Sequence, residues 1–64
     1  MKVIDFVNLC DFPDTVDFTL YDYDVYDVVF EGKCDEIPEL FFERKVRGFE
    51  LHNNKLILNL RAIK

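Results

Sequence analysis

The chain has 64 residues, and half of them are hydrophobic, including seven Phe and three Tyr. This composition excludes a disordered acidic tail, and no apolar run approaches the ~20 residues of a membrane span. The length predicts a single domain over residues 1–64. Because Asp5 and Asn8 interrupt the first ten residues and no cleavage site follows, a secretory signal is excluded and we expect a soluble, cytoplasmic protein.

Charge is sorted along the chain. Residues 1–39 carry eleven carboxylates and two lysines, whereas residues 40–64 carry six Lys or Arg and two Glu, within a net charge of −5. A chain of this size buries only ~60% of its unfolded surface, so we expect a marginal core. A homodimer is one way to bury more surface, and we predict one.

Periodicity predicts the first three elements. Polar residues recur every three positions over residues 2–11, which indicates a short amphipathic helix that ends at Phe12-Pro13-Asp14. Residues 15–21 alternate as a strand with Val16, Phe18 and Leu20 on one face. After a turn at residues 22–24, residues 26–31 alternate again, with Tyr26, Val28 and Phe30 on one side, and Gly32 closes that strand.

The second half predicts a helix and another hairpin. Asp35-Glu36-Ile37-Pro38 opens the helix, Leu40, Phe41 and Phe42 supply its buried stripe, and Arg44 and Lys45 suit its negative end. Gly48 marks a break or a bulge. Phe49 and Leu51 are expected on one face of the next strand, with Glu50 on the opposite face. Asn53-Asn54 predicts a tight turn, and Leu56, Leu58 and Leu60 share one face of the last strand. The fold class is α+β: an α-β-β-α-β-β domain whose four-stranded, mostly antiparallel sheet carries two short helices on one face.

No constellation indicates catalysis, a metal or a cofactor. The stretch 18–25 looks like the strand and Asp-x-Asp start of an aspartate-nucleophile phosphatase, but that chemistry needs further groups from a much larger domain. Asp22, Asp24 and Asp27 lack the glycine and terminal Glu of a calcium-binding EF-hand loop. Cys10 and Cys34 are predicted to be small buried thiols, and His52 an exposed residue at a hairpin tip. We therefore expect no enzyme.

The basic residues of the second half are Arg44, Lys45, Arg47, Lys55, Arg61 and Lys64. With neighbouring Phe side chains they could bind nucleic acid, but the isoelectric point of about 4.6 opposes direct binding. We predict instead that they pair with the acidic half, within the chain and between chains.

Carboxylates concentrate on the first predicted hairpin. Spacing of two along a strand separates side chains on one face by ~6.5–7 Å, comparable to phosphate spacing along DNA. We therefore predict a non-enzymatic binding protein that presents an acidic surface to a protein partner with a basic surface. The predicted partner-binding residues are Asp17, Asp22, Asp24, Asp27 and Glu31. Two alternatives stay open: a self-assembling homo-oligomer, and an oligomer that sequesters an anionic nucleotide against Arg44, Lys45, Arg47 and Arg61.

Short motifs over residues 15–60 add a context. These are Val29-Phe30-Glu31-Gly32, Asp35-x-Ile37-Pro38-x-Leu40, Lys45-Val46-x-x-Phe49 and Lys55-Leu56-x-Leu58. The chain resembles small acidic proteins encoded by phages and mobile elements of Gram-positive bacteria. The resemblance implies an accessory protein in the host cytoplasm that acts by binding, for example an anti-defence inhibitor such as an anti-CRISPR protein or a DNA mimic. No catalytic residue comes with it.

Overall fold

Four strands form one sheet whose centre is a parallel pair. The computed structural model describes residues 1–12 and 14–63, and contains helix α1 (Val3–Asn8) and strands β1 (Asp17–Asp22), β2 (Asp27–Lys33), β3 (Val46–His52) and β4 (Lys55–Leu60). The strand order is β2-β1-β4-β3. The hairpins β1–β2 and β3–β4 are antiparallel, and β1 and β4 run parallel between them. The fold is thus a small α+β domain with a mixed sheet.

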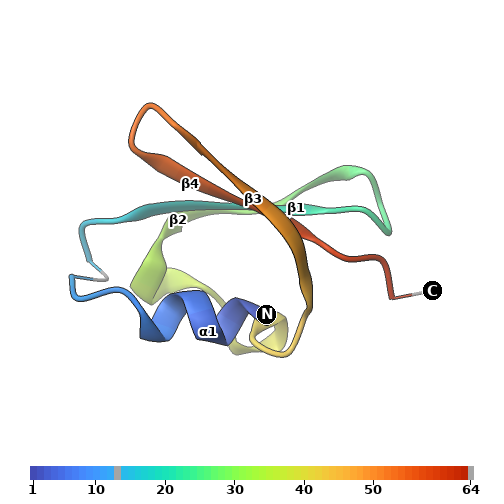
Figure 1. The fold of residues 1–64 in the computed structure, drawn as a ribbon, viewed down its shortest axis with the longest axis horizontal. Helices are drawn as coiled ribbons and strands as arrows, with labels where there is room; N and C mark the ends of the chain where they lie inside the picture. The colour runs from blue at the N-terminus through green and yellow to red at the C-terminus, as the bar shows by residue number, and fades with distance from the viewer. Residues whose placement is uncertain (13, 64) are drawn as a thin grey trace.

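Helix α1 and two short 3-10 turns lie on one side of the sheet (Figure 1). The Asp5 carboxylate accepts a hydrogen bond from the backbone N–H of Lys2 at 2.8 Å, which satisfies one free donor at the start of α1. Val3 is fully buried, and its N–H donates to the carbonyl of Arg44 at 3.0 Å. The predicted first helix is therefore present, although Pro13, expected to end it, lies outside the described residues.

The predicted second helix is wrong. Two 3-10 turns, η1 (Cys34–Glu36) and η2 (Glu39–Phe41), take its place, with Ile37 and Pro38 extended between them. Proline disfavours helical geometry in the residue before it, so Ile37 breaks the segment into two turns. Leu40 is consequently 75% exposed, whereas Ile37 is buried and Phe41 and Phe42 pack against the core.

A bulge in β2 also changes one predicted face. Leu20 pairs with Phe30, but the next residue of β1, Tyr21, pairs with Val28, so Val29 is an extra residue in β2. Val28 and Phe30 therefore face opposite sides of the sheet, contrary to the predicted common face. Tyr26 belongs to the turn, with φ of 53°.

The β3–β4 hairpin follows the prediction closely. Asn53 and Asn54 have φ of 48° and 66°, which suits a two-residue hairpin turn. The register of β3 shifts between Val46 and Gly48, so Gly48 lies beside a bulge, one of the two predicted roles. Phe49 and Leu51 pair with Leu58 and Leu56 and share their face, and Glu50 lies on the other face.

The core lies between the sheet and the side that carries α1. Its buried members are Val3, Phe18, Leu20, Cys34, Ile37, Leu58 and Leu60. The four largest of these side chains come from the central strands β1 and β4. The parallel pair of strands therefore carries most of the core. Within the described ranges, no helix has the length and apolar character needed to cross a membrane.

Leu58→Ala should lower the free energy of unfolding by about 2–5 kcal/mol, because Leu58 is fully buried in a central strand and its truncation leaves a cavity. Leu40→Ala is the matched control, since the Leu40 side chain is mostly exposed. Chemical denaturation of both variants measures the difference. Equal stability of the two variants would contradict this assignment of the core.

Candidate functional site

The five predicted partner-binding carboxylates do not form one surface. Asp22 is 6% exposed and lies at the edge of the core. Asp24, Asp27 and Glu31 are exposed, and Asp17 is half-buried on the uncovered face of β1. The structure thus separates one buried carboxylate from four that are in contact with solvent.

Asp22 forms a two-pronged ion pair with Arg44. The guanidinium donates to both carboxylate oxygens, at 2.8 and 2.9 Å, and both side chains are largely shielded from solvent. The backbone N–H of Asp24 donates to the same carboxylate at 2.8 Å. The hydrogen bond from Arg44 holds the pKa of Asp22 below its ordinary value, although burial opposes this shift. Two such charge-assisted bonds from one guanidinium to one carboxylate make this pair stronger and more specific in geometry than a single contact.

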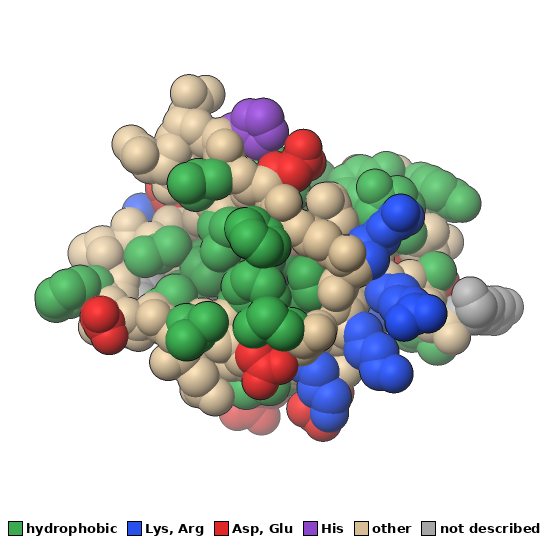
Figure 2. Space-filling view, viewed as in Figure 1, with side chains coloured by type: hydrophobic (Ala, Val, Ile, Leu, Met, Phe, Trp, Pro, Cys, Tyr) green, Lys and Arg blue, Asp and Glu red, His purple; other side chains and the backbone are tan. Residues whose placement is uncertain are grey.

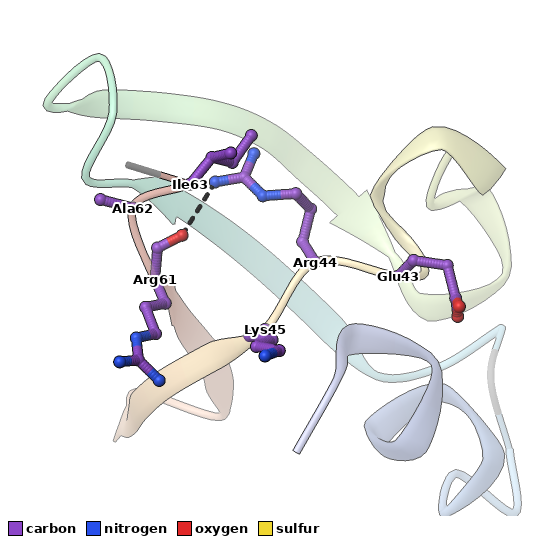
Figure 3. Close-up of a pocket in the computed structure, with 6 residues that line it drawn as sticks. All are labelled: Glu43, Arg44, Lys45, Arg61, Ala62 and Ile63. Atoms are coloured by element: carbon purple, nitrogen blue, oxygen red, sulfur yellow. Dashed lines mark hydrogen bonds between the residues drawn. The ribbon is translucent and has the colours of Figure 1, made fainter.

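The same cluster holds the end of the chain. Asp24 accepts a hydrogen bond from the backbone N–H of Ile63 at 3.0 Å, and Arg44 donates to the carbonyl of Arg61 at 3.1 Å (Figure 3). Arg44 also lies 3.4 Å from the Asp24 carboxylate. Asp22 and Asp24 therefore join the β1–β2 turn to the segment before β3 and to the segment after β4. The predicted pairing of the basic residues with the acidic half is thus confirmed for Arg44, whereas Lys45, Arg47, Lys55 and Arg61 form no ion pair with a described residue.

The alternation along the first strand already indicates that Asp22 faces the core. Phe18 and Leu20 face the core, and the period of two along a strand places Asp22 on that same face. A carboxylate at such a position needs a cation, and Arg44 supplies it. The predicted strand instead ends at Tyr21, which assigns Asp22 to the exposed turn at residues 22–24.

Asp17, Asp27 and Glu31 differ in how far they are neutralised. Asp17 lies directly across from Lys33 in the β1–β2 ladder, with 2.7 Å between the charged groups. That hydrogen bond lowers the pKa of Asp17 and raises the pKa of Lys33. Asp27 and Glu31 lie on β2, an edge strand, and neither forms an ion pair with a residue that the structure describes.

A hollow of about 430 Å³ lies beside the buried ion pair. Its lining residues are Glu43, Arg44, Lys45, Arg61, Ala62 and Ile63 (Figure 3). Lys45 and Arg61 are exposed, but Arg44 is committed to Asp22. The guanidinium of Arg47 lies 4.5 Å from the centre of the Tyr23 ring, a cation–π contact on the uncovered face.

The remaining candidate residues have local roles. His52 lies at the end of β3 next to the hairpin turn, with its Nε2 3.6 Å from the Glu50 carboxylate. Cys34 is buried, and this burial raises the pKa of its thiol to about 12, while the half-buried Cys10 donates to the carbonyl of Phe6. Across residues 1–12 and 14–63, no group of three or more His, Cys, Asp and Glu is arranged to hold a metal ion.

Comparison with protein-family models, curated proteins and solved structures found no match for this chain.

Asp22→Asn should lower the free energy of unfolding by about 3 kcal/mol, because it leaves the guanidinium of Arg44 without its carboxylate in a shielded position. Asp27→Asn is the matched control, and it should change stability by less than about 0.5 kcal/mol because Asp27 is exposed. Urea denaturation at pH 7 compares them. Indistinguishable midpoints would show that the buried pair does not stabilise the fold.

Acid should destabilise the protein in a way that depends on Asp22. Its folded-state pKa lies below the ordinary value of 3.8, so its contribution is complete above pH 4–5. That contribution is lost as pH falls through the lowered pKa, because the unfolded chain binds the proton more tightly. Thermal melts between pH 7 and pH 2 should therefore show a shallower acid decline in Asp22→Asn than in the wild type. Parallel declines would contradict the assignment.

Proposed function

We propose that this protein acts by non-covalent binding, without catalysis, and that an acidic edge contacts a basic surface of a partner protein. The acidic edge consists of Asp27 and Glu31 on β2 and of Asp35 and Glu39 in the turns that follow it. These four carboxylates are exposed. The observation that carries the proposal is that Asp27 and Glu31 have no ion-pair partner among the described residues, and so remain available.

Two of the five predicted partner-binding residues, Asp27 and Glu31, belong to this acidic edge. Asp22 and Asp24 are not assigned to the partner contact, because both hold the fold together through Arg44 and Ile63. Asp17 is not assigned to it either, because Lys33 neutralises its charge. The partner class with the best electrostatic match is a nucleic-acid-handling protein, because its groove is already shaped for regularly spaced negative charge. The resemblance to accessory proteins of phages supports an inhibitor of a host enzyme as the sharpest form of this function.

Nucleotide sequestration receives less support. Of the four cations assigned to it, Arg44 is bound to Asp22 and Arg47 is stacked on Tyr23. Of these four cations, Lys45 and Arg61 are exposed and have neither an ion pair nor a cation–π contact with a residue that the structure describes. Two exposed cations give a weaker anion site than the acidic edge gives for a basic groove.

The combined change Asp27→Asn and Glu31→Gln should weaken partner binding by up to about 2 kcal/mol, mainly through slower association, because each rim charge contributes ~0.2–1 kcal/mol. The measurement is capture of proteins from a bacterial lysate, followed by elution with competing duplex DNA and by association kinetics on the eluted partner. Raised salt should reproduce the effect, because salt screens exposed charges.

The matched control is Asp11→Asn with Asp14→Asn, which removes the same number of exposed carboxylates from the loop before β1. It should bind like the wild type. A partner retained equally by all three proteins at low and moderate salt would show that the acidic edge serves solubility alone.

A further inference from the structure

The sheet has two edges, and unpaired charges of like sign protect only one of them. The edge strand β2 presents Asp27 and Glu31, and like charges on an edge oppose pairing with a second sheet. The other edge strand, β3, presents Phe49 and Leu51, which are 62% and 71% exposed although they face the side that carries α1. Figure 2 shows hydrophobic side chains gathered at the centre of the face that this strand crosses.

The backbone of β3 is also available at this edge. The hairpin closes on the pair His52–Lys55, and hydrogen-bonded and non-hydrogen-bonded pairs alternate from there. Phe49 and Leu51 fall in non-hydrogen-bonded pairs, so their N–H and C=O groups point away from β4. At the start of the strand the edge is already covered, because the N–H of Val46 donates to the carbonyl of Met1 at 2.7 Å. The free stretch is therefore 47–52.

We propose that the free edge of β3 pairs antiparallel with β3 of a second copy of this chain, about a two-fold axis at Phe49, to form a continuous eight-stranded sheet. In this register the two Phe49 residues exchange backbone hydrogen bonds, and Gly48 lies opposite Glu50 of the second copy. A Cβ on Gly48 would meet nothing within 4 Å, so there is room for the facing Glu50 side chain. The aromatic contact between Phe6 and Phe49, with ring centres 5.8 Å apart, adds α1 to the apolar surface that the two copies bury.

Charge complementarity selects a second copy as the occupant of this edge. Arg47 contacts Tyr23, and Glu50 lines the same hollow of the uncovered face as Tyr23, so Arg47 and Glu50 lie on the same side of β3. The two-fold axis places each Arg47 diagonally across from Glu50 of the other copy. Because the contact with Tyr23 leaves Arg47 without an ion pair among the described residues, this arrangement gives two symmetric ion pairs. The strand is thus complementary to itself in shape, hydrogen bonding and charge, as an isologous interface requires.

Light scattering over a concentration series tests the interface. The wild type should reach twice the 7.7 kDa of one chain, and Leu51→Lys should raise the dimer dissociation constant at least about thirtyfold, as loss of a central apolar anchor does. Leu40→Lys is the matched control, because Leu40 is equally exposed but lies in η2. It should remain a dimer.

Swapping the charges at positions 47 and 50 tests the same interface even if Leu51→Lys fails to fold. Arg47→Glu and Glu50→Arg should each weaken the dimer, and the variant carrying both changes should recover it, since the ion pairs are restored with reversed sign. A wild-type protein that stays monomeric at millimolar concentration would overturn the proposal. A dimer that both single charge variants leave intact would also overturn it.

Discussion

The ion pair between Asp22 and Arg44 is the constraint on which the arrangement of this chain depends. A carboxylate on the buried face of a central strand is costly unless a cation meets it, and Arg44 meets it with two hydrogen bonds. Arg44 lies just before β3, and its guanidinium also binds the carbonyl of Arg61, just after β4. The pair therefore fixes the second hairpin against the first at the end of the parallel β1–β4 ladder.

This arrangement gives the sorted charge of the sequence a structural meaning. Three of the carboxylates of the acidic half form contacts within the chain. Asp22 pairs with Arg44, Asp24 accepts a hydrogen bond from the N–H of Ile63 near the C-terminus, and Asp17 pairs with Lys33. Exposed charge is distributed unevenly between the two edges of the sheet. The β2 edge carries unpaired carboxylates that suit a basic partner, whereas the β3 edge carries apolar side chains with one charge of each sign. The two proposed contacts, with a partner protein and with a second copy, therefore use opposite edges and do not exclude one another.

Local patterns predicted most elements of the fold, and long-range contacts decided what they missed. The alternation of Leu56, Leu58 and Leu60 and the turn at Asn53-Asn54 could be predicted because period and turn geometry are encoded within a few residues. The break at Ile37 follows from Pro38, which is a local signal in the sequence, whereas the bulge at Val29 leaves no mark in the local alternation. The parallel pairing of β1 with β4 joins residues about forty positions apart, so hairpin reasoning alone could not supply it.

The candidate site shows the same division. Excess carboxylates on the first hairpin were visible in the sequence, but the sequence does not state which of them a distant arginine neutralises. The inward position of Asp22 followed from strand parity; its partner did not.

A double-mutant cycle on Asp22→Asn and Arg44→Met, followed by urea denaturation at pH 7, tests the central claim most directly. If the pair joins the two hairpins, the two changes together should cost clearly less than the sum of the single changes, with a coupling free energy of about 2 kcal/mol or more. Single effects that add within about 0.5 kcal/mol would contradict the account, because they would show that the two side chains act independently.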